Sequence, residues 1–272
     1  MRTIKYIVCS IIVLLFSDIS NAEIVSNIQA EGACAIVGMT AEQCQLTALQ
    51  RARAAAIEQA AGMSVSSSTL VTNMALTAEF IKSYSKGFIV KEKVEWPTPG
   101  QYQKDPSTPA LIEYRVKITA DVKLPEPKIK PIGIRASTNA IVYKNGDKAV
   151  IEVSADRESK IGIFNITADD KVFMVFPNEH DKDNKASKAK KLVFPGKNAR
   201  SELEMQTLEG HKRDAEAFFI VGLDGDHARD FIGMFKPSQS MSFSDFFRKY
   251  SEIADYAEDV ILTYEVINSK DK

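Results

Sequence analysis

The loop Asn178–Asn184 is the part of the chain richest in groups that could do chemistry. It offers oxygen and imidazole donors at Glu179, His180, Asp181, Asp183 and Asn184. Such oxygens are the ligands that calcium prefers. However, the loop lacks the twelve-residue spacing and the final glutamate of the common calcium loop, and lysines interrupt it. We therefore predict a solvated turn without a metal or cofactor, with a hydrolase or ligand-binding site in this loop as the alternative.

Lysines continue beyond this loop at high density. Five amines fall within ten residues, at Lys182, Lys185, Lys188, Lys190 and Lys191. The aspartates between them reduce the local positive field, so a solvated face is the favoured interpretation. Contact with an anionic glycan or lipopolysaccharide is the sharper alternative. We treat the segment from Glu179 to Lys191 as a candidate interaction loop.

A second place for acid–base chemistry is the turn Asp224–His227. Aspartates are common in turns for structural reasons, so this signal is weak. The chain has only three histidines. It contains no GxSxG, no HExxH and no phosphate-binding glycine loop, which removes the commonest hydrolase and nucleotide-binding patterns. The sequence therefore predicts a protein without catalytic residues, and a site at this turn belongs to the alternative hypothesis.

The amino terminus has the pattern of a signal peptide. Arg2 and Lys5 precede the apolar run Ile7–Phe16, which is too short to span a bilayer as a stable helix. Small residues lead up to Ala22, so we expect cleavage between Ala22 and Glu23. Residues 1–22 are then the signal peptide of a periplasmic or secreted protein. No later apolar stretch is long enough to form a transmembrane segment.

The remaining composition is that of a globular protein. The chain has 272 residues, of which 44% are hydrophobic and 26% charged. Removing residues 1–22 takes away two basic groups and one acidic group, which moves the formal charge from −1 to −2. This balance gives no general attraction to nucleic acid.

Two cysteines, Cys34 and Cys44, remain after cleavage. In an oxidising compartment the favoured prediction is a disulfide between them. Two free buried thiols are the alternative. A zinc site is less favoured, because two further ligands would have to come from the distant second half of the chain.

Residues 23–124 read as an α+β unit with helices on one face of an antiparallel sheet. A strand is expected over Ile24–Val37. A helix follows from Thr40, with Gln43 completing a capping box and Gly62 ending the helix. A further strand and helix are expected over Met63–Val71 and Thr77–Ser85. The alternating segments Phe88–Trp96 and Leu111–Val122 predict a hairpin, whose proline-rich loop Pro97–Pro109 is expected to be a solvated insertion.

Three motifs in this unit carry a family resemblance: RARAAAIEQAAG at 51–62, SKGF at 85–88 and YRV at 114–116. They resemble the amino-terminal domain of flagellar assembly protein T and the related short surface lipoproteins. The resemblance implies an envelope-associated protein that packs against other proteins. Such domains also occur far from any flagellum.

A proline-rich linker is predicted at 125–133, followed by a β-rich domain at 134–223. Asn145 and Gly146 favour a tight turn, which predicts a hairpin between Ala140–Tyr143 and Lys148–Ala155. Further strands are expected at a spacing typical of a β-sandwich: Lys160–Thr167, Val172–Phe176, Lys191–Phe194, Ser201–Gln206 and Ala215–Val221.

The second resemblance lies in this domain. The sequence VYKNGD at 142–147, the strand end Phe176, Pro177, Asn178 and the return strand ending in Pro195 and Gly196 resemble a bacterial domain-of-unknown-function family. The resemblance implies an accessory module. The Phe-Pro-Asn motif itself is explained structurally, because Pro177 cannot donate to a sheet and Asn178 can bond back to its own backbone.

Residues 224–272 are predicted to form a helix–strand extension that packs on the preceding domains. Ser242 caps a helix over Ser242–Tyr256 with Asp245 three residues on, and the alternating segment Asp259–Ile267 is expected to join one of the sheets. We predict an α+β protein, exported and non-enzymatic, that acts as a protein-interaction or accessory scaffold module. Its expected partners are envelope or periplasmic proteins.

Overall fold

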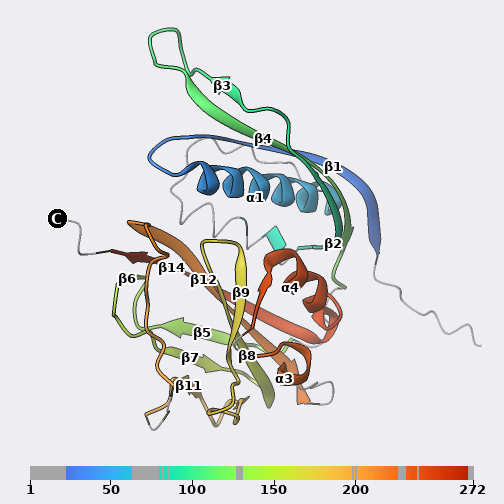
Figure 1. Cartoon of the computed structure of the whole chain (residues 1–272). Helices are drawn as coiled ribbons and strands as arrows, with labels where there is room; N and C mark the ends of the chain where they lie inside the picture. Colours follow the sequence, from blue (N-terminus) through green and yellow to red (C-terminus); the bar gives the residue numbers. More distant parts are fainter. Residues whose placement is uncertain are drawn as a thin grey trace, which may run out of the picture.

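The computed structural model describes residues 23–62, 80, 83–84, 86–126, 131–197, 199, 201–225, 231–237 and 239–268. Several predictions therefore lie outside the described residues: the signal peptide, the strand at 63–71, most of the helix at 77–85 and part of the linker. The protein is a mixed α+β fold (Figure 1). No helix within the described ranges is long and apolar enough to cross a membrane.

The amino-terminal part is an antiparallel sheet. Its strands are β1 (Ile24–Ala35), β2 (Phe88–Glu95), β3 (Gly100–Tyr102) and β4 (Leu111–Lys123). Their order is β1-β4-β2, with β3 beside the first residues of β4. The predicted hairpin is therefore confirmed as the pairing of β2 with β4, and part of its loop is itself a strand.

Helix α1 (Ala41–Ala60) covers one face of this sheet, beneath β1 and β4 in Figure 1. The side chain of Thr40 accepts from the Gln43 amide and the Gln43 side chain accepts from the Thr40 amide, which confirms the predicted capping box. Gly62 follows the helix with φ of +68°. Gly32 of β1 lets the helix approach closely, because a Cβ there would clash with the Ala48 carbonyl oxygen.

The carboxyl-terminal part contains a seven-stranded sheet. Its path is β13-β9-β8-β12-β14-β6, with β10 also pairing with β8. The strands are β6 (Val142–Lys144), β8 (Ser159–Ile166), β9 (Lys171–Phe176), β10 (Lys185–Ala186), β12 (Arg213–Asp224), β13 (Ser240–Ser242) and β14 (Ala257–Ile267). The predicted last strand thus joins this sheet beside β12, as expected. It lies next to the end of the sheet, because the short strand β6 pairs only with its last three residues.

A small sheet packs on one face of the seven-stranded sheet. It has the order β11-β7-β5, formed by Leu192–Phe194, Ile151–Ser154 and Arg135–Thr138. Phe218 and Ile220 of β12 point into this sandwich core. Phe219 and Val221 point to the opposite face, where a second core contains residues of α1 and α4. Because both faces are covered, β12 can be apolar without alternation.

Short helices complete the second core. They are α3 (Phe231–Met234), α4 (Phe243–Tyr250) and a 3-10 turn at Ala254–Tyr256. The Ser242 side chain accepts from the Asp245 amide at 3.1 Å and so caps α4 as predicted. Helix α4 contacts both β2 and β9, so it joins the two parts of the protein.

Two predictions within the β-rich part are wrong. The turn at Asn145 and Gly146 exists, but its flanking strands do not form a hairpin: β6 pairs in parallel with β14, whereas β7 pairs with β5 and β11. The turn carries the chain from one sheet of the sandwich to the other, because Tyr143 packs against Tyr264. The predicted strand Ser201–Gln206 forms only an isolated bridge, between Lys148 and Glu204, since its neighbour is this crossing turn.

Candidate functional site

The candidate interaction loop is a hydrogen-bonded turn organised by Asn178. The side-chain oxygen of Asn178 accepts from the amides of His180 and Asp181 at 2.9 and 2.8 Å. Its amide nitrogen donates to the Val175 carbonyl at 3.0 Å. Phe176 is buried and its ring lies 4.9 Å from that of Phe194. These contacts fix the start of the loop and leave its later side chains outward.

Several charged groups of the loop have local partners. Asp181 accepts from Ser201 at 2.9 Å, Asp183 from Lys190 at 2.7 Å, and Lys185 donates to Glu158 at 3.0 Å. The hydrogen bond from Lys190 holds the pKa of Asp183 below its usual value. Glu179, His180, Lys182, Lys188 and Lys191 are exposed. The carboxylates do not converge, and no group of three metal-binding histidine, cysteine, aspartate or glutamate side chains exists among the residues that the structure describes.

A shallow depression lies beside the end of this loop. Its volume is about 260 Å³, and it is formed on the small sheet by Arg135, Ser137, Glu152, Ser154 and Lys191. The Arg135 guanidinium is already paired with Asp156 at 2.6 Å. The depression therefore offers hydroxyl groups, one lysine and one glutamate.

The other predicted site is only partly described. Asp224 ends β12 and pairs with Arg157 at 2.9 Å. Asp226 and His227 lie outside the described residues. The part of this turn that the structure describes thus forms a salt bridge at the end of β12.

The predicted disulfide is not formed. Cys34 and Cys44 are both free and buried. The Cys44 thiol donates to the carbonyl oxygen of Cys34 at 3.0 Å. Burial raises the pKa of the Cys34 thiol to about 12. The alternative of two free buried thiols describes this pair.

A buried ion cluster joins the two parts of the protein. Arg53 of α1 is 5% exposed and binds Glu92 of β2 through two hydrogen bonds of 2.7 and 3.0 Å. It also binds Asp170, in the turn between β8 and β9, at 3.0 Å. Ser244 of α4 donates to Glu92 at 2.8 Å. This cluster rests on pairings between distant segments that the sequence did not indicate.

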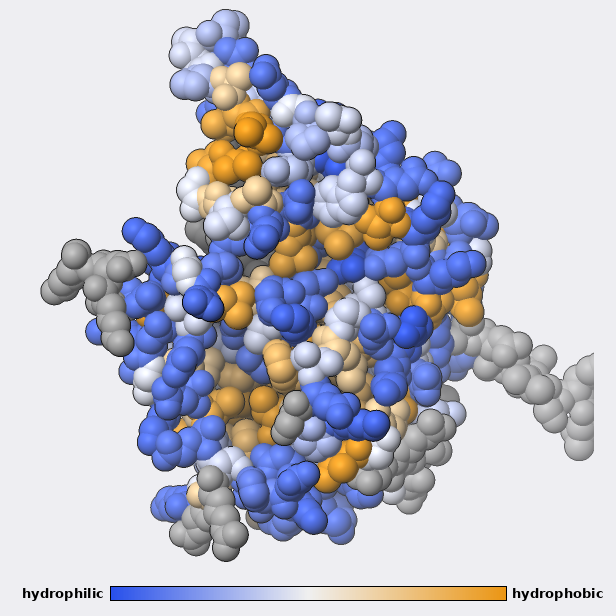
Figure 2. All heavy atoms as spheres, viewed as in Figure 1, coloured by the Kyte–Doolittle hydropathy of each residue, from blue (hydrophilic) through white to orange (hydrophobic). Residues whose placement is uncertain are grey.

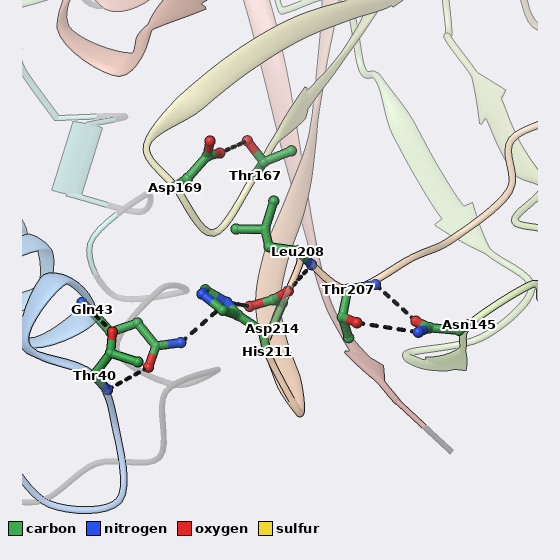
Figure 3. A network of polar contacts seen from close by, with 9 residues as sticks. All are labelled: Thr40, Gln43, Asn145, Thr167, Asp169, Thr207, Leu208, His211 and Asp214. Carbon is green, nitrogen blue, oxygen red and sulfur yellow. Dashed lines mark hydrogen bonds and ion pairs between the residues drawn. The ribbon is translucent and has the colours of Figure 1, made fainter. Parts of the chain in front are cut away.

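A second polar cluster lies at the end of the sandwich (Figure 3). His211 lies between Gln43 of α1 and Asp214 of β12, with Nδ1 3.2 Å from the Gln43 side-chain nitrogen and 2.6 Å from the Asp214 carboxylate. On the same strand Glu216 is 4% exposed and accepts from the Tyr264 hydroxyl at 2.6 Å. The sequence singled out Gln43 as part of a capping box, but it gave no sign that these side chains meet.

An exposed apolar group among the described residues of the amino-terminal part was also missed. Strand β3 and the first residues of β4, Leu111–Glu113, form an arm that projects past α1 (Figure 1). The arm is one strand layer thick. We define the arm patch as Ile36, Val37, Tyr102, Leu111 and Ile112. The backbones of these residues are neighbours, because the Ile36 amide donates to the Ile112 carbonyl at 2.9 Å and Tyr102 pairs with Leu111. Since consecutive strand residues point to opposite faces, Ile36 and Ile112 lie on one face of the arm and Tyr102 and Leu111 on the other. Apolar residues below a polar tip are visible on this arm in Figure 2.

The exposures within the arm patch are high for apolar residues. Val37 is 60% exposed, Ile112 54% and Tyr102 37%. Trp96, at the end of β2, is 45% exposed. The signal that could have located the patch was the presence of Tyr102, Leu111 and Ile112 at both ends of a polar loop. Tyr102 lies within the loop that was predicted to be a solvated insertion, and Leu111 and Ile112 follow it.

Comparison with known proteins identifies one part of the chain. Residues 142–213 match the family described as Domain of unknown function (DUF4384). The predicted resemblance of the β-rich part to a domain-of-unknown-function family is therefore confirmed for this segment. No curated protein matches the chain. Nothing supports the predicted likeness of the amino-terminal part to flagellar assembly protein T.

Proposed function

We propose that this protein is an exported, non-enzymatic interaction module that binds another protein of the cell envelope through the arm patch. The observation that carries the proposal is the exposure of Val37 and Ile112, at 60% and 54%, on an arm that no described helix or sheet covers. Isolated apolar side chains are common on surfaces, but neighbouring apolar residues that include an aromatic residue are typical of protein interfaces.

The charges near the arm support an apolar rather than an electrostatic contact. Lys117 pairs with Glu31 at 3.0 Å, and Arg115 pairs with Glu113 at 2.7 Å. Since these groups satisfy one another, the arm offers little net charge to a partner. We therefore expect an apolar core of the interface with a polar rim, and binding that changes little with salt.

The polar tip of the arm favours a protein over a lipid bilayer. Lys104 and Asp105 lie in the loop beyond the arm patch. Inserting the patch into hydrocarbon end-on would bury these charges, which costs several kcal/mol for each unpaired group. A partner that contacts the arm from the side avoids this cost.

Site-specific photo-crosslinking in the native host tests the proposal. A photoreactive phenylalanine analogue at Ile112 should give one discrete crosslinked product, and the same probe at Val193, which is 42% exposed on the small sheet, is the matched control. The additional change Val37→Ser should weaken the product at least several-fold. Equal crosslinking at both positions, or none at Ile112, would contradict the proposal. So would binding to phospholipid vesicles that depends on Ile112.

The depression on the small sheet favours a second candidate function, binding of an acidic saccharide. The supporting observation is the position of Lys191 beside the hydroxyl groups of Ser137 and Ser154. A hydrolase at the neighbouring loop is less supported, because Asp181 and Asp183 are held by local partners. Titration with a purified acidic glycan should show binding that Lys191→Gln weakens. An unchanged affinity in that variant would eliminate this candidate.

A further inference from the structure

Three sulfur atoms meet where the chain passes from β1 into α1. The Sγ atom of Cys34 lies 3.8 Å from the Sδ atom of Met39. The Cys44 thiol donates to the Cys34 carbonyl oxygen at 3.0 Å, and the two thiols are in hydrogen-bonding contact with each other. Packing of α1 against β1 therefore gathers two thiols and one thioether in one place.

The spacing of these sulfur atoms suits a shared metal ion. Three sulfur atoms arranged in a plane around one ion, each about 2.3 Å from it, lie about 4 Å from one another. The distance of 3.8 Å between Cys34 and Met39 is close to this value. The three side chains can therefore take an ion with little rearrangement of the backbone.

The kind of donor atom selects a soft monovalent ion. Thiolate and thioether sulfur atoms are the ligands that copper(I) prefers. Zinc takes cysteine, histidine and carboxylate ligands instead, and no third side chain of these kinds groups with the two cysteines in the part of the chain that the structure describes. The carboxylate of Glu113, which is nearby, is held by Arg115 at 2.7 Å. The donor set therefore favours copper(I) over zinc.

Arg51 of α1 provides a positive charge beside the sulfur atoms. One of its terminal nitrogens donates to the Ala33 carbonyl of β1 at 2.6 Å, next to Cys34. Its Nε atom is buried and has no hydrogen-bond partner among the described residues. Burial raises the pKa of both thiols, and the charge of Arg51 opposes this rise. Two thiolates and one copper(I) ion carry a net charge of −1, which this guanidinium balances.

The turn Val37–Met39 separates the sulfur atoms from solvent. Cys34 and Cys44 are 4% and 0% exposed, whereas Val37 is 60% exposed. Gly38 is also exposed, and a Cβ atom on it would meet no other atom within 4 Å. Met39 is half-buried. An ion that enters from this side meets the thioether first and the two thiols below it.

We propose that Cys34, Cys44 and Met39 form a binding site for one copper(I) ion, with Arg51 balancing the charge of the two thiolates. Binding forms three copper–sulfur bonds and releases the two thiol protons to solvent. No electron is transferred, so the step needs no oxidant or reductant. The site does not depend on the proposed role of the arm patch, although Val37 belongs to both the patch and the turn that covers the sulfur atoms.

Anaerobic titration of the intact, reduced protein with copper(I), against a chromogenic copper(I) chelator, tests the site. We expect one bound ion per chain and an X-ray absorption spectrum with only sulfur atoms around the copper. Met39→Leu keeps an apolar side chain of similar size and should weaken binding at least about tenfold, since even outer partners of a metal site contribute that much. Met241→Leu, at a half-buried methionine of β13, is the matched control and should bind normally. Replacing both Cys34 and Cys44 by Ser should abolish binding.

Four results would overturn the site. The first is no copper binding by the folded, reduced protein, and the second is a spectrum with nitrogen or oxygen atoms bound to the copper. The third is an unchanged affinity in Met39→Leu. The fourth is isolation of the protein from its host with Cys34 and Cys44 joined in a disulfide, because a disulfide has no thiolate to offer. The spectrum of the natural protein decides the matter even where a variant does not fold.

Discussion

Replacing Arg53 by Met is the sharpest test of how the two parts of the protein are held together. The substitution keeps an unbranched apolar side chain against the core but removes the guanidinium. Glu92 and Asp170 then lose hydrogen bonds of 2.7, 3.0 and 3.0 Å. After the substitution Glu92 still accepts a hydrogen bond from the Ser244 side chain. Asp170 keeps no such side-chain partner among the described residues.

The magnitude follows from the burial of the three groups. Removing one member of a buried ion pair costs about 3 to 5 kcal/mol, because the remaining charge is left uncompensated. The side chains of Glu92 and Asp170 are 15% and 16% exposed, so some water reaches them. We therefore expect Arg53→Met to lower the free energy of unfolding at pH 7 by about 3 kcal/mol, the lower end of this range.

The loss should shrink in acid. Burial raises the pKa of Glu92, but hydrogen bonds and charge from Arg53 outweigh it and leave the pKa below its ordinary value. The stability that this depressed pKa contributes is present above about pH 4.5 and is lost as the pH falls further. The variant lacks this contribution at every pH, so the two proteins should approach each other below pH 4.5.

Denaturant unfolding followed by circular dichroism at pH 7 and pH 4 measures the difference. Arg135→Met is the matched control, because Arg135 and Asp156 form an exposed pair whose loss should leave the stability nearly unchanged. Adding Glu92→Gln and Asp170→Asn to Arg53→Met should restore most of the stability. A loss below 1 kcal/mol at pH 7, or one that grows in acid, would refute this reasoning.

Three further changes have defined outcomes. Gly32→Ala should destabilise the fold by about 3 kcal/mol in thermal unfolding, since its Cβ would meet the backbone of α1, whereas Gly100→Ala, with no atom within 4 Å of its Cβ, should not. Asn178→Ala should cost about 2 to 3 kcal/mol through the four hydrogen bonds that its side chain makes; an equal loss in Asn178→Asp, which keeps both acceptor bonds, would argue against this account. Cys34 and Cys44 should react with a thiol reagent at pH 8 only after denaturation, because burial raises both pKa values; reaction in the native state would contradict their burial.

The local signals of the sequence located most helices and strands. The capping box at Thr40 and Gln43 and the cap at Ser242 each depend on residues three positions apart. They can therefore form whatever surface the helix packs against. Alternation along β4 reflects one covered face and one exposed face. The division of the chain into domains, by contrast, stays a prediction.

Local sequence patterns did not predict in the same way which strands pair or which distant side chains meet. The turn at Asn145 and Gly146 has the composition of a hairpin, but the packing of Tyr143 sends its two strands into different sheets. The disulfide was predicted from compartment and spacing. The orientation of the two thiols is set by how α1 lies on β1, which is decided by close contact at Gly32.

By itself, the sequence determined the element types, the α+β class and the kinship of residues 142–213, because these depend on local backbone preference and on motifs. The tertiary structure alone decided which side chains meet. Arg53 and Asp170 are 117 residues apart in the chain and 3.0 Å apart in space. The exposure of Ile112 likewise depends on the place where α1 begins, at Ala41. Surfaces and buried charge clusters arise from packing between distant segments, which no local pattern encodes.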